Sequence, residues 1–434
     1  MTLKSSSLTP LVRFLAVVAG LIVVASCGGG SSSSSSNSSS TPPPPSANNS
    51  VDVEVNLGAT GDYVDGLFTS VQVCAPGSTT NCVTVPDVLV DTGSYGLRLL
   101  SGALGSLSLP PVTDTSGNDV QECQQFISLD YIWGPVMQAD IHLSGETASS
   151  AAIHVISESP QYPAPASCLT LGTGGADDNS VSALGANGIL GVGGLPTDCT
   201  SSCTSVGNCT TPCTSASNGI PYYFSCPNGD CQVTSVPLSG IVPNPVALFS
   251  QDNNGVLISL PTIPASGQAT ASGSLIFGIG TESNNALGSA QIYATAAGEY
   301  FTTTYNGTSY SNSFIDSGSN AFYILDSSTL GGIECTNANY QGFYCPGSTL
   351  TFNVRNSGIN GTSGEVSFTI ENAASLFSND FAAFNDLGGD SGTSPATDYF
   401  DFGVPFFFGR NVFVGIAGKT VPTGASAPYG YWAY

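Results

Sequence analysis

The stretch Val88-Leu89-Val90-Asp91-Thr92-Gly93-Ser94 has a second, similar copy in Ser313-Phe314-Ile315-Asp316-Ser317-Gly318-Ser319. Each copy is an apolar run followed by Asp, a hydroxyl residue, Gly and another hydroxyl residue. A further apolar run follows each copy, at residues 97–100 and 322–325. Two segments with the same plan predict a chain built from two related lobes.

The two repeated Asp residues, Asp91 and Asp316, each stand at the tip of a predicted strand. The glycine two positions later allows backbone groups to approach the carboxylate closely, and the next residue, Ser94 or Ser319, can donate a hydrogen bond to it. If the two loops meet across a two-fold axis, the two carboxyl groups lie close together. Because like charges at that range repel, the two groups cannot be ionised at the same time, so the pair holds one proton between them. One carboxylate can then act as a base toward a water while the protonated one polarises a carbonyl. We therefore expect neither a metal nor a cofactor.

Composition excludes one class of partner. Charged residues make up 8% of the 434 residues, and 30 Asp and Glu against 6 Lys and Arg give a net charge of −24. Proteins that bind the phosphate backbone need clustered Lys and Arg, so we expect no nucleic acid. The acidic excess fits an acidic setting, where fewer carboxylates are ionised and self-repulsion falls.

The rest of the chain predicts an all-β fold. Gly (52) and Pro (27) are abundant, as in proteins of short strands and turns. Short apolar or alternating runs predict strands near residues 51–55, 67–73, 83–90, 153–156, 256–260, 275–279, 350–354, 366–370 and 406–414. No sustained helical periodicity occurs, although short helices are expected near residues 245–251 and 373–384.

Over most of residues 51–434 the chain resembles the two-lobed pepsin-like aspartic proteases. The resemblance rests on the two Asp loops and on companion stretches in the same chain order, at residues 128–134, 187–193, 272–278 and 402–407. It implies an N-terminal lobe at 51–285, a C-terminal lobe at 286–434 and a cleft between them. It also implies an aspartic endopeptidase, favoured at acidic pH and monomeric, that acts on a peptide or protein substrate.

The resemblance assigns roles to single residues. Asp91 and Asp316 would be the catalytic pair, and Thr92 and Ser317 would tie the two loops together beneath the carboxylates. Gly93, Ser94, Gly318 and Ser319 would complete the loops, with the two serines bonded to the outer carboxylate oxygens. Tyr131 would be the tyrosine of the flap, a hairpin that closes over the substrate.

Some residues depart from the family pattern. Arg98 and Asp401 stand where apolar residues are usual, and Trp133 with the Gly134-Pro135 step replaces a glycine-rich flap tip. The alternative is therefore a catalytically silent relative with a binding or structural role in the cell envelope, in which the two Asp residues are structural.

For three further features we expect no catalytic role. The motif Asp390-Ser391-Gly392-Thr393 also fits the short pattern, but no apolar strand flanks it, so we expect a surface loop there. His142 and His154 alternate with apolar residues in predicted strands, and we expect surface positions for both.

The first 27 residues predict a signal peptide, with a sparse basic start and an apolar run too short to favour a membrane span. Val24-Ala25-Ser26-Cys27 resembles the lipobox of bacterial lipoproteins, which implies lipid on Cys27; an ordinary signal peptide is the alternative. Residues 28–50 predict a disordered Ser/Pro-rich tether. The start, with the ending at residues 406–411, also resembles a family of bacterial lipoproteins without an assigned activity. We expect an exported protein, anchored to the membrane by this lipid in the cell envelope, at the outer membrane.

The remaining 12 cysteines predict six disulfides, because an even number of cysteines in an exported protein indicates disulfide pairing. We expect a local bridge between Cys335 and Cys345. Cys74 and Cys82, like Cys226 and Cys231, are close neighbours. A cluster at positions 199, 203, 209 and 213 could pair within itself or, as the alternative, bind zinc.

Overall fold

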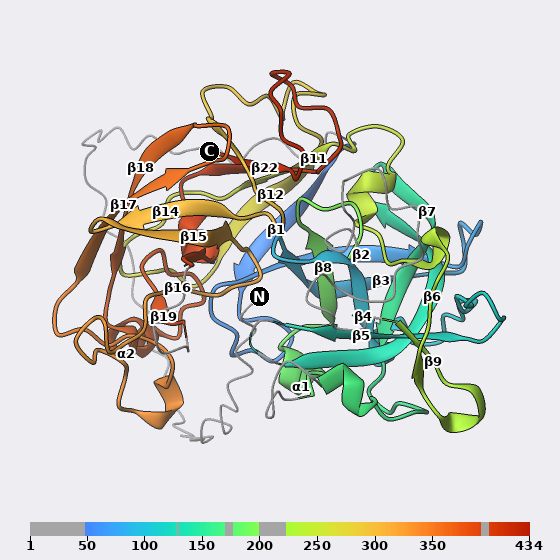
Figure 1. Ribbon diagram of the computed structural model, residues 1–434. Coiled ribbons are helices and arrows are strands. Elements are labelled where there is room, and N and C mark those ends of the chain that lie inside the picture. The colour runs from blue at the N-terminus through green and yellow to red at the C-terminus, as the bar shows by residue number, and fades with distance from the viewer. Residues whose placement is uncertain (1–47, 127, 129, 170–176, 199–222, 392–398) are drawn as a thin grey trace, which may run out of the picture.

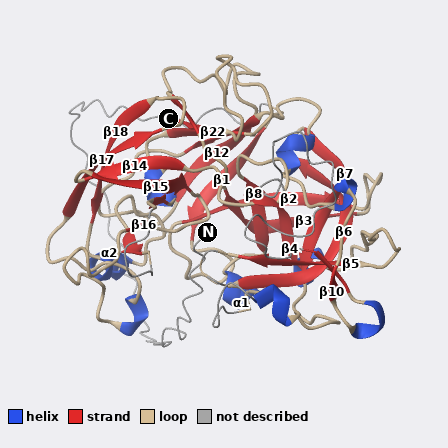
Figure 2. Ribbon diagram, in the orientation of Figure 1, coloured by secondary structure: helices blue, strands red, loops and turns tan. Residues whose placement is uncertain are grey.

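The computed structural model describes residues 48–126, 128, 130–169, 177–198, 223–391 and 399–434. Strands dominate these residues, and the helices are short (Figure 2). Two groups of strands lie on either side of a central set (Figure 1). The predicted class, all-β with two lobes, is confirmed. The boundary after residue 285 stays a prediction.

The first lobe, at the right of Figure 1, is a closed barrel. Its strands pair in the order β2-β3-β8-β4-β7-β6, and β6 closes the ring by pairing with β2. The hairpin strand β5 and the short strands β9 and β10 continue the sheet beyond β6. The bounds are β2 Gly66–Cys74, β3 Cys82–Asp91, β4 Tyr95–Leu100, β5 Val120–Gln125, β6 Tyr131–Leu143, β7 Glu146–Ile156, β8 Gly188–Val192, β9 Tyr223–Ser225 and β10 Gln232–Val233.

The second lobe, at the left of Figure 1, is an open sheet of seven strands among the described residues. The order is β18-β17-β14-β15-β20-β16-β19. The bounds are β14 Phe301–Tyr305, β15 Thr308–Ile315, β16 Phe322–Ile324, β17 Leu350–Ser357, β18 Ser363–Ile370, β19 Gly388–Asp390 and β20 Asp401–Phe402.

A third set of strands runs between the lobes and draws on both ends of the described chain. Its order is β1-β12-β11-β21-β22-β13, and β1 also pairs with β2 of the barrel. The bounds are β1 Ser50–Asn56, β11 Gly255–Ser259, β12 Ala271–Phe277, β13 Ile292–Ala294, β21 Asn411–Gly415 and β22 Tyr431–Ala433. One apolar core includes residues from this set and from both lobes, such as Val53, Leu190 and Phe402.

The two lobes share one local topology. In the first, β8 runs parallel to β3 and antiparallel to β4, so it lies between the strand before Asp91 and the strand after it. In the second, β20 lies in the same way between β15 and β16, around Asp316. The next strand out, β7 or β19, is parallel to β4 or β16 respectively. The sequence repeat is therefore a repeat of backbone structure.

Glycine is required where each middle strand passes the Asp loop. A Cβ on Gly191 would lie 2.6 Å from the backbone nitrogen of Tyr95, and a Cβ on Gly403 would collide with the carbonyls of Ser319 and Ala321. Because real Cβ atoms do not come this close to backbone, these positions admit no side chain.

The helices are single turns. They are α1 Val181–Leu184, α2 Ala373–Leu376 and the 3-10 segments Ser101–Leu104, Ala166–Leu169, Pro227–Gly229, Leu238–Gly240, Pro245–Leu248, Ala338–Tyr340, Phe377–Asn379 and Val404–Phe406. The expected helices near residues 245–251 and 373–384 are thus present but shorter. Within the described ranges, no helix has the length and apolarity to cross a membrane.

Four disulfides lie within the described residues: Cys74–Cys82, Cys123–Cys168, Cys226–Cys231 and Cys335–Cys345. The expected bridge in the second lobe is confirmed. The cysteines at positions 199, 203, 209 and 213 lie outside the described residues. The structure therefore tests only four of the six predicted bridges.

Two local predictions are wrong. Residues 406–414 do not form one strand: Pro405, which lacks a backbone donor, lies in the 3-10 turn Val404–Phe406, Gly409 adopts a left-handed conformation, and β21 begins only at Asn411. In the motif at residues 390–393, Asp390 ends strand β19, which pairs with β16, and Ser391 is buried, so a surface loop is wrong for these two residues; residues 392 and 393 lie outside the described residues. Position 389 of this strand admits no side chain, because a Cβ on Gly389 would lie 2.5 Å from the ring of Tyr323.

Candidate active site

The two Asp loops are tied to each other by reciprocal hydrogen bonds. The Thr92 hydroxyl donates to the carbonyl of Ile315 at 3.2 Å and accepts from the backbone N–H of Ser317 at 2.9 Å. The Ser317 hydroxyl donates to the carbonyl of Val90 at 2.8 Å and accepts from the N–H of Thr92 at 3.1 Å. These contacts are the ones expected from the family resemblance, and they fix the two loops against each other.

The carboxyl groups of Asp91 and Asp316 meet above these ties. The Gly93 N–H reaches both, at 2.8 Å from Oδ1 of Asp91 and 3.1 Å from Oδ1 of Asp316. Oδ1 of Asp316 also accepts from the Gly318 N–H at 2.7 Å. A Cβ added to Gly93 would lie 2.6 Å from Oδ2 of Asp316, and a Cβ added to Gly318 would lie 2.6 Å from Oδ1 of Asp91. Each glycine therefore makes room for the carboxyl of the opposite loop.

The environment favours one shared proton. Both Asp side chains are fully buried. Burial raises the pKa of Asp91 well above its usual range, the negative charge of Asp316 raises it further, and the hydrogen bond from Ser94 opposes this. Since Asp91 accepts its proton more readily than an exposed carboxyl does, the pair can hold one acid and one base together.

The outer oxygens are bound by the predicted serines, but the two loops differ. The Ser94 hydroxyl donates to Oδ2 of Asp91. The Ser319 hydroxyl lies 3.0 Å from Oδ2 of Asp316 and also 2.6 Å from Oδ2 of Asp401, a buried residue of β20. A third carboxyl thus contacts the second loop, which the sequence marked only as an unusual residue.

Another carboxyl, that of Glu299, is linked to the first loop through Tyr95. Tyr95 follows Ser94, and its hydroxyl donates to Oε2 of Glu299. Oε1 of Glu299 accepts from the N–H of Gly194, just after β8. Burial raises the pKa of Glu299 to about 8, although these two hydrogen bonds oppose the shift. Nothing in the sequence pattern pointed to Glu299, because its partners lie about 100 and 200 residues away.

Tyr131 and Tyr63 differ in their surroundings. Tyr131 begins β6 of the β5–β6 hairpin, where the flap was expected, and its side chain packs on the apolar cluster around the Cys123–Cys168 bridge. Tyr63, which the sequence reasoning missed, is affected by the charges of both Asp residues: burial raises its pKa, and the charges of Asp316 and then Asp91 raise it further. The flap role of Tyr131 stays a prediction.

A buried ionic network lies behind the first loop. The Arg98 guanidinium donates to Glu122 at 2.8 Å and lies 3.5 Å from Asp198. Burial alone would lower the pKa of Arg98, but the charges of Glu122 and Asp198 raise it. His154 lies 3.5 Å from Glu122 and is fully buried, so the surface position expected for it is wrong; burial lowers its pKa to about 4. Alternation of apolar and polar residues along β7 does not show which side chains become buried when the barrel closes. His142, by contrast, is partly exposed.

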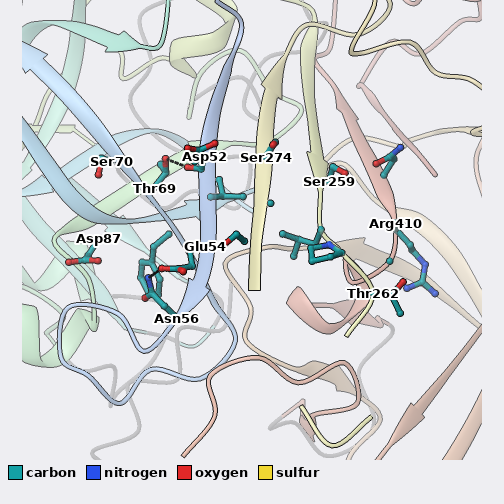
Figure 3. A pocket seen from close by; sticks show the side chains of 18 of the residues that line it. Asp52, Glu54, Asn56, Thr69, Ser70, Asp87, Ser259, Thr262, Ser274 and Arg410 are labelled. Atoms are coloured by element: carbon teal, nitrogen blue, oxygen red, sulfur yellow. Dashed lines mark hydrogen bonds between the residues drawn. The ribbon is translucent and has the colours of Figure 1, made fainter. Parts of the chain in front are cut away.

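A separate hollow of about 970 Å³ lies on the set of strands between the lobes (Figure 3). Polar side chains such as Asp52, Glu54, Ser274 and Arg410 line it. None of its lining residues belongs to either Asp loop, so it is distinct from the dyad. The described part of the chain contains no cluster of His, Cys, Asp or Glu that could hold a metal ion.

Residues 45–434 match the family described as "Protein of unknown function (DUF3443)". The chain belongs to this family. No curated protein matches the chain. Among solved structures, this family member is similar to an aspartic proteinase from Irpex lacteus, with 15% sequence identity and a TM-score of 0.44, over 88% of this chain and 96% of that one.

Proposed function

We propose that this protein is an aspartic endopeptidase, which hydrolyses peptide bonds through Asp91, Asp316 and a water held between them. The observation that carries the proposal is the meeting of two buried carboxyls on duplicated loops, with a glycine opposite each one. One carboxylate takes a proton from the water as it attacks the scissile carbonyl, and the protonated partner donates to the carbonyl oxygen.

The electrostatics support the same assignment. One carboxyl must stay protonated, so hydrolysis falls at high pH when the shared proton is lost, and at very low pH when both carboxyls are protonated. Burial and the neighbouring charge raise the pKa of Asp91, which favours the singly protonated pair. Tyr131 would close over an extended peptide that pairs with the hairpin in strand fashion.

The test is cleavage of a mixed peptide library by the purified chain from pH 3 to 7, with and without a transition-state inhibitor of aspartic proteases. Asp316→Asn keeps the shape but cannot share the proton. We expect its rate to fall at least about a thousandfold, which is roughly 4 kcal/mol of transition-state stabilisation.

Asp390→Asn is the matched control, since Asp390 also precedes a hydroxyl residue and Gly but binds the N–H of Ser327 at 3.1 Å instead of the dyad. It should retain wild-type activity. If the wild-type protein cleaves no peptide at any acidic pH, the silent binding or structural role is correct instead. If Asp316→Asn cleaves as well as wild type, the catalytic assignment is wrong.

The cellular setting is a separate proposal. Cys27, outside the described residues, would carry the lipid, and the tether would hold the enzyme at the cell envelope, at the outer membrane. Mass spectrometry of the membrane fraction should find a diacylglyceryl group on an N-terminal Cys27. A soluble protein without lipid would contradict this proposal and leave the enzymatic one intact.

A further inference from the structure

Asp401 contacts the second Asp loop through Ser319. The Asp401 side chain is fully buried, and its Oδ2 lies 2.6 Å from the Ser319 Oγ. The same Oγ lies 3.0 Å from Oδ2 of Asp316. The three groups form a continuous hydrogen-bonded path from Asp401 to one carboxyl of the dyad.

The hydrogen on Ser319 limits how this path is protonated. A serine hydroxyl has one hydrogen to donate, and an ionised carboxylate only accepts. Ser319 can therefore donate to one of the two carboxyls, and the other must donate to Ser319. Oδ1 of Asp316 already accepts from the N–H groups of Gly318 and Gly93, so Asp316 is the acceptor at this end of the path and the donor role falls to Asp401. The proton therefore belongs on Asp401.

The first loop has no such path. The register of the strands pairs Ile189 of β8 with Leu89 and Arg98, and pairs Asp401 of β20 with Phe314 and Tyr323. Ile189 therefore occupies the position equivalent to Asp401. Since its side chain has no polar atom, it cannot hydrogen-bond Ser94, so the third carboxyl is specific to the second lobe.

Two of the ionisable groups near Asp401 are acids. Asp316 lies beyond Ser319, and Tyr323 faces Asp401 in register on β16. The pKa of Tyr323 is raised by burial and, after the charge of Tyr63, by the charge of Asp401. Any ionisation among them makes loss of the Asp401 proton harder.

We propose that Asp401 is a positioning residue that supplies a proton to the dyad through Ser319 and so extends activity to higher pH. This inference rests on the proposed peptidase function. When the dyad loses its proton, the proton on Asp401 passes to Ser319 Oγ as the hydrogen of Ser319 passes to Oδ2 of Asp316. One O–H bond breaks on Asp401, one forms on Asp316, and Ser319 is left unchanged.

The same outcome follows from charge. If Asp401 ionises first, its negative charge lies within about 6 Å of Asp316, since both contact one oxygen, and this raises the pKa of the dyad. Asn at position 401 can donate to Ser319 but never ionises. The alkaline limit of activity should therefore lie lower in Asp401→Asn.

The first test is the pH profile of kcat/KM for peptide hydrolysis. In Asp401→Asn we expect the alkaline midpoint to fall by about one to two pH units, while the acid limb and the rate at the optimum stay near wild type. Asp386→Asn is the matched control: it removes another buried carboxyl of the second lobe, whose pKa is raised by burial and by the charge of Glu371 and not by either Asp of the dyad. Its profile should be that of wild type. An unchanged alkaline limb in Asp401→Asn would overturn the proposal.

The second test needs no catalytic activity. The unfolded Asp401 ionises near pH 4, whereas the folded residue keeps its proton, so wild type should lose stability relative to Asp401→Asn as pH rises. In urea unfolding from pH 4.5 to 6.5, the ratio of the two unfolding constants should rise about tenfold per pH unit. A ratio that stays constant would show that Asp401 does not hold the proton, even if wild type proves to have no peptidase activity.

Discussion

The two lobes fold around the same strand arrangement but place polar groups in opposite positions. In the first lobe, the strand after the loop carries Arg98 and the strand between carries Ile189. In the second, the strand after the loop carries Tyr323 and the strand between carries Asp401. The duplicated backbone therefore brings the two carboxyls together, whereas the side chains behind each loop are not duplicated.

The two loops also differ in how each is connected to a buried acid. The first loop reaches a buried acid indirectly, through Tyr95 to Glu299, whereas the second reaches Asp401 directly through its own serine. The first lobe also has a buried ionic network that the second lacks at the equivalent position, where Tyr323 pairs with Gly389 instead of Arg98 with His154.

The largest effect is expected at Arg98. Arg98→Met removes the cation and leaves Glu122 and Asp198 buried without it, which should cost about 3–5 kcal/mol in the free energy of unfolding. Tyr323→Phe, at the equivalent position of the second lobe, removes one hydroxyl that donates to Asn320 and should cost about 1 kcal/mol. Urea unfolding of both variants measures the difference. Equal costs would refute the contrast between the lobes.

Glu299 should make stability fall with pH. The pKa of Glu299 in the folded protein, about 8, lies above the ordinary 4.5 of a Glu side chain, so the folded state keeps a proton that the unfolded state has lost. That contribution is complete below about pH 4.5 and is lost as pH rises toward 8. Between pH 4.5 and 7, the free energy of unfolding of Glu299→Gln should therefore rise by roughly 3 kcal/mol relative to that of wild type. Parallel stability curves for the two proteins would contradict the assignment.

The two loop glycines should be equally sensitive, because the dyad is the part of the molecule that the lobes share. Gly93→Ala and Gly318→Ala each place a methyl group against the opposite carboxyl and should lower peptide hydrolysis roughly a hundredfold, about 2.7 kcal/mol. Gly347→Ala is the control, since no atom lies within 4 Å of its Cβ position. An effect in only one of the loops would mean that the dyad is asymmetric in its contacts as well as its surroundings.

The smallest effect is expected at the surface ion pair of the second lobe. Arg355 and Glu365 lie 3.0 Å apart across β17 and β18, with 55% and 68% of their side chains exposed. Solvent screens such a pair, so Arg355→Ala should cost less than about 1 kcal/mol. A cost near that of Arg98→Met would show that burial does not separate the two arginines.

The sequence by itself determined the repeat, the all-β class and the identity of the loop residues. This was so because local patterns encode them: alternation encodes strands, and Asp, hydroxyl, Gly, hydroxyl encodes a loop that presents a carboxylate. The same reasoning failed where pairing between distant segments decides the structure. Strand β19 has too little apolar sequence to be recognised, and His154 is buried because the barrel closes over it.

Only the tertiary structure decided which other groups reach the dyad. Asp401 lies 82 residues from Ser319, Glu299 lies 204 residues from Tyr95, and Tyr63 comes from a loop without a motif. Their protonation depends on burial and on neighbouring charges, which arise when strands distant in sequence pack together. A local pattern can therefore identify Asp91 and Asp316, but the groups that affect their protonation are brought near them only in the folded chain.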